Sequence, residues 1–252
     1  MQLYQGDCLE VMKQIPDKSV DMILCDLPYG TTACKWDIII PFDKLWEQYN
    51  RIIKDNGAIL LFGSEPFSSA LRMSNIKNYK YDWYWEKERG TGFARANKQP
   101  LRKIENICVF YKKQPFYDSI GERLGKPYKH ALPIIKSDSD NVSNNNLENG
   151  NRVYAVYEYS KKHNVLRFSR KTKGSLHPTQ KPVELLEYLI KTYTNDGNTV
   201  LDNCMGSGTT GVACKHLNRN FIGIELDTNY FEIAKNRIEN EPTQLTLAEQ
   251  KE

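Results

Sequence analysis

The segment Thr199-Val200-Leu201-Asp202-Asn203-Cys204-Met205-Gly206-Ser207-Gly208-Thr209-Thr210-Gly211 decides the fold of this chain. It begins with a short strand-like run, continues through a glycine-rich turn and enters a stretch with helical spacing that reaches residue 217. Glycine lets a backbone approach a ligand closely, and the first turn of a helix offers free N–H groups. The segment therefore predicts a layered α/β fold with a ligand at the tip of this strand.

The next predicted strand, Phe221 to Glu225, ends in an acid about twenty residues after the glycine turn, where a carboxylate can accept hydrogen bonds from both hydroxyls of a ribose. A surface acid at a strand end is the alternative for Glu225. The spacing Gly206-x-Gly208-x-x-Gly211 also fits a dinucleotide fingerprint. These residues alone thus leave an NAD-type site open.

A second strand tip lies near the start of the chain, where the apolar run Val20 to Cys25 leads into Asp26-Leu27-Pro28-Tyr29. The run reads as a buried parallel strand. Its tip combines a carboxylate, a rigid carbonyl and a flat ring, which can hold a planar, amino-bearing ring by its edge and face. The alternative is an ordinary turn in which Asp26 serves as a cap.

Strand and helix patterns alternate along much of the chain, which predicts an α/β domain. Strands are expected at residues 2–5, 20–25, 58–62, 79–85, 106–111, 199–202 and 221–225. Helices are expected at residues 9–15, 42–54, 66–76, 182–193, 209–217 and 229–239. Between them we expect a loop at 87–103 and little regular structure at 112–176, including a polar loop at 137–146. Trp83 and Trp85 alternate on a strand and are expected in the core.

The chain has 252 residues and a formal net charge of +4, which hides an uneven distribution. Residues 86–175 hold 19 Lys and Arg against 9 Asp and Glu, whereas the remainder holds 16 against 22. A basic segment inside an acidic body favours a polyanion as partner, and a solvated basic surface is the alternative.

The six cysteines form no CxxC pair and the four histidines do not gather near them, which argues against a zinc site. The N-terminal sequence is not a signal peptide, and no apolar run is long enough to cross a bilayer. We therefore expect a cytoplasmic protein with reduced cysteines, no bound metal and no membrane contact.

Four segments together resemble the S-adenosylmethionine-dependent DNA amino-methyltransferases. Residues 202–209 look like the family's D-P-F-x-G-S-G-T loop, and residues 26–29 look like its D-P-P-Y loop. His177 to Pro182 matches H-P-T-Q-K-P, and Gly6-Asp7 resembles the acid-bearing strand end that receives the cofactor's adenine. The resemblance covers about residues 2–30, 58–111 and 177–239, and the order of the segments is that of the permuted beta class.

The resemblance implies a Rossmann-like methyltransferase sheet with helices on both faces, S-adenosylmethionine as cofactor and S-adenosylhomocysteine as product. The first and last strands would be neighbours, and both loops would meet at the carboxyl ends of the strands. The catalytic residues would be Asp26 and Pro28, which accept hydrogen bonds from the target amine, and Tyr29, which stacks on the base. The cofactor-binding residues would be Asp7, Cys8, His177, Thr179, Lys181, Asp202, Met205, Gly206, Ser207, Gly208, Thr209, Thr210 and Glu225.

The same resemblance divides the chain by role. Residues 1–111 would form the catalytic half, 112–176 the inserted target-recognition region, 177–240 the cofactor-binding half and 241–252 a loose tail. Double-stranded DNA would be held with its target base flipped out, and Arg95, Lys98, Arg102 and Lys103 would clamp its backbone. A homodimer is common among beta-class relatives.

An acid at position 26 favours N6 of adenine as the target, whereas serine there more often accompanies N4 of cytosine. The chain departs from the family pattern at two positions: Leu27 replaces a proline and Cys204 replaces a phenylalanine that packs on the cofactor. A soft, smaller group should pack less well. The alternatives are an N4-cytosine enzyme, a catalytically weak DNA-binding relative, or a methyltransferase acting on a small molecule or a protein amide.

Overall fold

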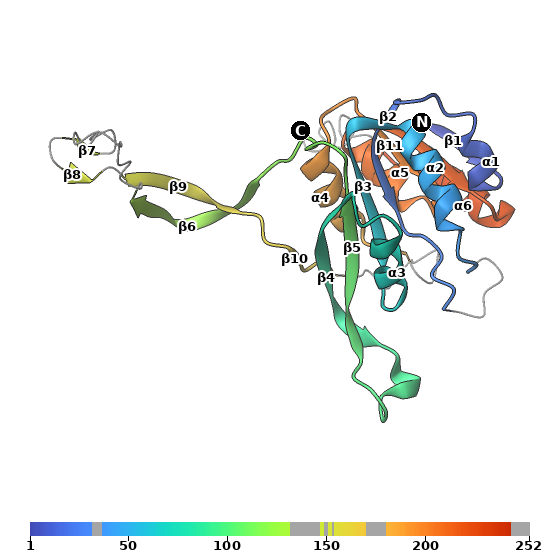
Figure 1. The fold of residues 1–252 in the computed structure, drawn as a ribbon, viewed down its shortest axis with the longest axis horizontal. Coiled ribbons are helices and arrows are strands. Elements are labelled where there is room, and N and C mark those ends of the chain that lie inside the picture. Colours follow the sequence, from blue (N-terminus) through green and yellow to red (C-terminus); the bar gives the residue numbers. More distant parts are fainter. Residues whose placement is uncertain (32–36, 132–146, 149–150, 153, 170–179, 243–252) are drawn as a thin grey trace. The chain divides into compact units, whose positions relative to one another are not determined.

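The computed structural model describes residues 1–31, 37–131, 147–148, 151–152, 154–169 and 180–242 (Figure 1). The chain divides into two compact units, one of Met1–Asp118 with Asn164–Glu252 and one of Ser119–His163. The roles assigned above to 1–111, 112–176 and 177–240 stay predictions. Among the described residues no helix combines the length and apolarity needed to cross a membrane.

The first unit is built on an eight-stranded sheet with the order β1-β12-β11-β2-β3-β5-β4-β10. The strands are β1 (Gln2–Gln5), β2 (Val20–Cys25), β3 (Ile53–Gly63), β4 (Tyr79–Thr91), β5 (Arg102–Phe110), β10 (Val165–Leu166), β11 (Thr199–Asp202) and β12 (Asn220–Glu225). The five strands from β1 to β3 run parallel, and β5 is antiparallel to β3 and β4. The first strand pairs with β12, with Gln5 opposite Glu225, which confirms the neighbours expected from the permuted order.

Helices cover both faces of this sheet, as the α/β prediction required (Figure 1). The helices are α1 (Cys8–Met12), α2 (Phe42–Ile52), α3 (Phe67–Ser74), α4 (Val183–Tyr193), α5 (Thr209–His216) and α6 (Thr228–Asn240). The first three pack into one apolar core and the last three into the other. In α2 the helical spacing brings Leu45, Trp46, Tyr49 and Ile52 to one buried face, and this burial fixes the helix on the sheet.

Helices α1, α2 and α3 each end two or three residues earlier than expected. Helix α1 stops at Met12 rather than residue 15, and α2 stops at Ile52, where β3 begins at once. Gly57 is therefore part of a strand with a register shift and not a helix terminator. A Cβ at Gly57 would lie 2.8 Å from the carbonyl oxygen of Asp21, so the two backbones can approach only because this residue is glycine.

The loop expected at 87–103 is wrong for most of its length, because β4 continues to Thr91 and β5 starts at Arg102. The two strands form a hairpin arm whose tip carries a single 3₁₀ turn, Phe93–Arg95 (Figure 1). A cross-strand ion pair of Lys103 with Glu86, at 2.8 Å, supports the arm. Both faces of the arm are polar, so the alternation that reveals a half-buried strand is missing.

The second unit also contains strands that the sequence did not predict. Strand β6 (Ile120–Ala131) pairs antiparallel with β9 (Tyr154–Lys161), and β7 (Leu147–Glu148) pairs with β8 (Asn151–Arg152). The expectation of little regular structure at 112–176 is thus wrong for these residues. Pairing between segments this far apart leaves no local periodicity. The tract at 137–146 lies outside the described residues.

Trp83 and Trp85 are both buried in the core, as predicted. The Tyr193 hydroxyl accepts a hydrogen bond from Trp83 Nε1 at 2.7 Å and shares another with the Tyr81 hydroxyl at 2.8 Å. This contact joins β4 to α4. Residues 181 and 182 lead directly into that helix, so the contact also helps to hold them in place.

We predict that Tyr193→Phe destabilises the protein by about 1–3 kcal/mol, because it leaves the buried Trp83 N–H without a partner. At about 2–4 °C per kcal/mol for a chain of this size, thermal melting should detect the loss. Tyr4→Phe is the control, since that hydroxyl has only an exposed bond of 3.4 Å. Equal melting temperatures for both variants would contradict the assignment.

Candidate active site

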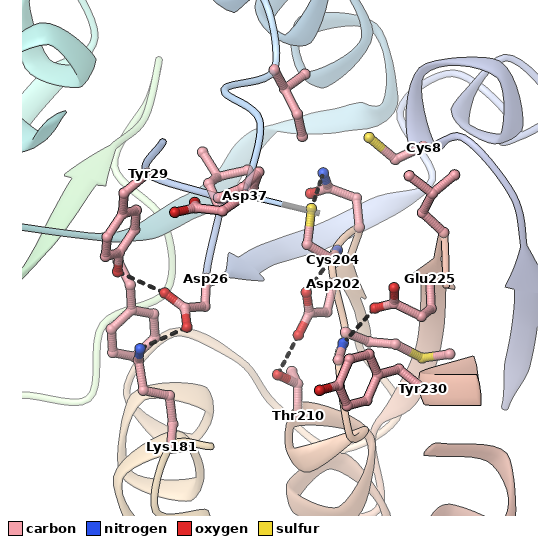
Figure 2. A pocket seen from close by; sticks show the side chains of 18 of the residues that line it. Cys8, Asp26, Tyr29, Asp37, Lys181, Asp202, Cys204, Thr210, Glu225 and Tyr230 are labelled. Carbon is pink, nitrogen blue, oxygen red and sulfur yellow. Dashed lines mark hydrogen bonds and ion pairs between the residues drawn. The ribbon is translucent and has the colours of Figure 1, made fainter. Parts of the chain in front are cut away.

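One cavity of about 630 Å³ lies where the parallel strands end, and both predicted loops line it (Figure 2). Strands β1, β12, β11 and β2 share an edge of the sheet, and each delivers an acid there because parallel strands end on the same side. These acids are Asp7, Glu225, Asp202 and Asp26. The loops around residues 26 and 206 therefore meet, as the family pattern implied.

The strand tip at Asp26 is held by hydrogen bonds to both oxygens of the Asp26 carboxylate. Tyr29 donates to Oδ1 at 2.6 Å, and Lys181 Nζ donates to Oδ2 at 2.6 Å (Figure 2). Pro28 also lines the cavity. Leu27 is 4% exposed and packs in the core, so the departure from proline gives the loop an apolar anchor.

Asp37 fixes the rest of this loop, and the sequence reasoning missed it. Its buried carboxylate accepts hydrogen bonds from the backbone N–H groups of Gly30 and Thr31, both at 2.8 Å. Gly30 has a φ of 66°, a conformation that favours glycine. The sequence around Asp37 carries no periodic apolar pattern that would mark this residue.

Glu105 is a second residue that the sequence reasoning missed. Its carboxylate lies 2.7 Å from Lys181 Nζ and 3.5 Å from Lys87 Nζ, and it accepts from the Tyr29 hydroxyl at 3.2 Å. Burial disfavours its charge, but the attraction of Lys181 outweighs this and lowers the pKa of Glu105. For Asp26 the balance is reversed: burial raises its pKa, although the attraction of Lys181 acts to lower it. The sequence signal that could have revealed Glu105 is an acid just before the apolar run of β5.

The cofactor loop is shaped by two acids. Asp202 accepts from the Thr210 hydroxyl at 2.6 Å and from the backbone N–H of Cys204 at 3.1 Å. Burial nevertheless raises the pKa of Asp202 to about 6. Glu225 accepts from the backbone N–H of Gly206 at 2.8 Å, and its pKa is raised by burial (Figure 2).

Two glycines of this loop occupy positions where any other residue would be strained. Gly206 and Gly208 have φ values of 51° and 75°, and a Cβ on Gly208 would lie 3.0 Å from Ala234 Cβ. Gly208 caps α5, so the free N–H groups of the helix start face the end of the loop. A turn of this kind, next to an acid at the neighbouring strand end, fits a nucleoside-containing cofactor.

Three thiols gather beside the loop. Hydrogen bonding to Cys25 and burial raise the pKa of Cys204 well above its ordinary value, and the pKa of Cys8 is raised in the same way by its bond to Cys204. Asn203 Nδ2 donates to Cys204 Sγ at 3.5 Å and its Oδ1 accepts from Tyr49 at 2.5 Å. The position that departs from phenylalanine thus holds a protonated thiol in a packed, hydrogen-bonded cluster.

The structure brings most of the predicted site residues together. The cavity is lined by Asp7, Cys8, Asp26, Pro28, Tyr29, Lys181, Asp202, Met205, Gly206, Ser207, Thr209, Thr210 and Glu225. His177 and Thr179 lie outside the described residues. Lys181 lies at the strand tip and donates a hydrogen bond to Asp26, and no hydrogen bond joins its ammonium to the glycine loop in the described part of the chain. Lys98, Arg102 and Lys103 are exposed on the hairpin arm, and Arg95 is in its terminal turn.

A family model described as DNA methylase matches residues 20–236. The protein belongs to this N6/N4 DNA methylase family. The prediction of the family from four short segments is thereby confirmed.

Curated relatives and the solved structures of similar proteins agree with this family assignment. The Type II methyltransferase M.HpaI of Haemophilus parainfluenzae is 29% identical over 94% of this chain and 73% of its own length. The Type II methyltransferase M1.MboII of Moraxella bovis is 26% identical over 90% of this chain and 92% of its own length. The M1.HpyAVI–SAM complex is 26% identical with a TM-score of 0.62 and covers 94% of this chain and 98% of its own.

The cytosine-N4-specific PvuII DNA methyltransferase has a TM-score of 0.65 over 96% of this chain and 93% of its own, at 16% identity. At that identity the likeness concerns the fold alone. It confirms the predicted Rossmann-like sheet and carries no information on the target base.

We predict that Glu225→Gln weakens the binding of S-adenosylmethionine at least tenfold, because the charge is lost and the amide NH2 would face one of the two backbone N–H donors that the carboxylate now accepts from. Loss of one hydrogen bond to a charged group is worth about 1.5–3 kcal/mol, which corresponds to this factor. Calorimetric titration measures it. Glu187→Gln, on α4 and outside the cavity, is the control, and unchanged affinity in Glu225→Gln would refute the assignment.

Proposed function

We propose that this DNA methylase transfers a methyl group from S-adenosylmethionine to the exocyclic N6 of adenine at a specific DNA site. The observation that carries the proposal is the cavity that both loops share. Asp26, Pro28 and Tyr29 line one part of it, and the glycine loop with Glu225 lines another. Donor and acceptor can therefore occupy adjoining places, and such orientation can supply about 7–11 kcal/mol of the barrier.

The amine of adenine is a poor nucleophile because its lone pair is conjugated with the ring. Acceptors at the Asp26 carboxylate and the Pro28 carbonyl would hold the amine hydrogens and favour a lone pair directed out of the plane. When bound, S-adenosylmethionine supplies a sulfonium methyl; the nitrogen lone pair forms the new N–C bond and the C–S electrons stay on sulfur. The nitrogen then releases one proton, which passes to solvent water.

Tyr29 offers the surface on which the base would stack. Its ring packs against Phe67, with centroids 5.0 Å apart and planes at 30°, and its hydroxyl is fixed on Asp26. The plane of the ring is therefore set before a base arrives, which lowers the entropy cost of binding.

The acid at position 26 supports adenine rather than cytosine, because the family pattern couples an acid there to N6 chemistry. N4 of cytosine is the second candidate, since both amines present the same two hydrogens to Asp26 and Pro28. The relatives named Type II methyltransferases support a role in restriction–modification.

We also propose that the target base leaves the duplex, because a base within the stack cannot enter a cavity of this kind. Unstacking costs a few kcal/mol, which contacts to the DNA backbone must offset. The hairpin arm is suited to make such contacts, since Thr91 lines the cavity, the exposed Phe93 follows at the tip, and Lys98 and Arg102 are exposed beyond it. Target recognition by residues 112–176 and a homodimer belong to the same proposal.

We predict that Asp26→Ala abolishes methyl transfer, because the amine loses its charged acceptor. The measurement is incorporation of label from S-adenosylmethionine into DNA, followed by nucleoside analysis that separates N6-methyladenine from N4-methylcytosine. Asp21→Asn, on β2 but outside the cavity, is the control. Absence of transfer by the wild type to any DNA would overturn the enzyme proposal and leave the DNA-binding relative in its place.

We predict that Lys98→Ala/Arg102→Ala weakens DNA binding at all sequences and lowers the salt dependence of binding by about two phosphate contacts. Lys44→Ala/Lys77→Ala removes the same charge from exposed positions away from the arm and serves as the control. Fluorescence anisotropy at several salt concentrations gives both slopes. Equal slopes in the two double variants would show that the arm does not hold phosphates.

A further inference from the structure

We infer that Glu105 is a positioning residue for methyl transfer, which holds the Lys181 ammonium and the Tyr29 hydroxyl so that Asp26 can accept the target amine. The inference rests on the proposed function and goes beyond it, because Glu105 belongs to none of the four short segments on which the family resemblance was based. Four side chains carry it: the two acids, the lysine and the tyrosine.

Asp26 is occupied before any base arrives. Each of its oxygens already accepts one hydrogen bond of 2.6 Å, from Tyr29 and from Lys181. A carboxylate oxygen has two lone-pair sites, so an amine could still bind, but it would compete with a full positive charge and a hydroxyl. The arrangement works as an acceptor for the base only if those two donors have another partner.

Glu105 is that partner for both donors. Lys181 Nζ lies 2.6 Å from Asp26 and 2.7 Å from Glu105, so one ammonium is shared between two carboxylates at nearly equal distance. The Tyr29 hydroxyl carries one hydrogen and has an acceptor on each acid, at 2.6 Å and 3.2 Å. Rotation of that O–H toward Glu105 leaves Asp26 Oδ1 free for the amine.

Exposure separates the roles of the two acids. The Asp26 side chain is 27% exposed, whereas those of Glu105 and Lys181 are 10% and 9% exposed, and all three line the cavity. A base that enters therefore meets Asp26, with Glu105 and Lys181 behind it. A buried cation with one acid instead of two would bind that acid more tightly.

The balance of charges around Asp26 also indicates that Glu105 keeps Asp26 available as an acceptor. Lys87 Nζ lies 3.5 Å from the second oxygen of Glu105, so two ammonium groups face two carboxylates. Without the Glu105 charge, two cations would remain with Asp26 alone. Asp26 would then be a weaker acceptor for the amine, while the cofactor loop, which Glu105 does not contact by any of these bonds, would be unaffected.

The test is Glu105→Gln, which keeps the shape of the side chain and removes its charge. We expect the single-turnover rate of methyl transfer to fall about 10- to 100-fold, with S-adenosylmethionine affinity within about twofold of the wild type, since a lost charged hydrogen bond has this magnitude. Asp82→Asn is the matched control, because Asp82 is an equally buried acid paired with Arg72 at 2.6 Å outside the cavity. It should lower stability and leave the rate unchanged.

The double variant Glu105→Gln/Lys181→Gln removes both charges and avoids an unpaired buried cation, and the Lys181→Gln single variant is measured with it. Because Glu105 acts through Lys181, we expect the double variant to lose less rate than the product of the two single losses and to have a rate near that of Lys181→Gln alone, a comparison that holds even if Glu105→Gln folds poorly. The groups that face Asp26 are Lys181, Glu105 and Tyr29, with Cys25 and Asp202 adjoining. Since the Glu105 charge raises the pKa of Asp26, the acid limb of the pH–rate profile should move to lower pH in Glu105→Gln.

Three results would overturn the inference: a wild-type rate in Glu105→Gln, multiplicative losses in the double variant, or a parallel loss of cofactor affinity. Failure of the wild type to methylate any DNA would overturn the proposed function together with this inference. A wild type that methylates and a Glu105→Gln variant that does so equally well would overturn the inference alone.

Discussion

The parallel pairing of β2 with β11 is the constraint on which the site depends. Val200 lies opposite Met22 and Leu201 opposite Ile23, so both strands end on the same edge of the sheet. The acids that follow them, Asp26 and Asp202, come from positions far apart in the sequence and line one cavity for this reason. Successive side chains of these strands alternate between the two cores, so a slip of one residue would move each of them into the opposite core and disrupt the packing on both faces.

Burying acids at this edge of the sheet costs free energy, and the fold offsets this cost with hydrogen-bond donors held in fixed positions. Asp202 and Glu225 take theirs from the chain around the glycine loop, whereas Asp26 and Glu105 share the ammonium of Lys181. A buried charge is tolerated when it is paired and hydrogen-bonded. Each acid thus keeps a defined direction, and the cavity presents oriented acceptors instead of mobile side chains.

The sequence predicted the parts of this molecule that are locally encoded. The strand of residues 199–202 matched in full, because its apolar run and glycine turn reflect burial and backbone conformation. The hairpin arm was missed because its strand ends lack an alternating apolar pattern, and the β6–β9 pair was missed because its two strands are remote in the sequence. The role of Glu105 and the ion pair between Lys181 and Asp26 were missed for a related reason. Ion pairs between residues far apart in the sequence leave no pattern along the chain.

The central claim is that one cavity holds the methyl donor and a flipped base side by side. A crystal structure of the protein with S-adenosylhomocysteine and a duplex containing its recognition site tests this most directly. The account predicts an extrahelical adenine whose amine lies within hydrogen-bond distance of the Asp26 carboxylate and the Pro28 carbonyl, with the ribose of the cofactor product on Glu225. A base that stays stacked in the duplex, or a cofactor product bound away from the glycine loop, would contradict it.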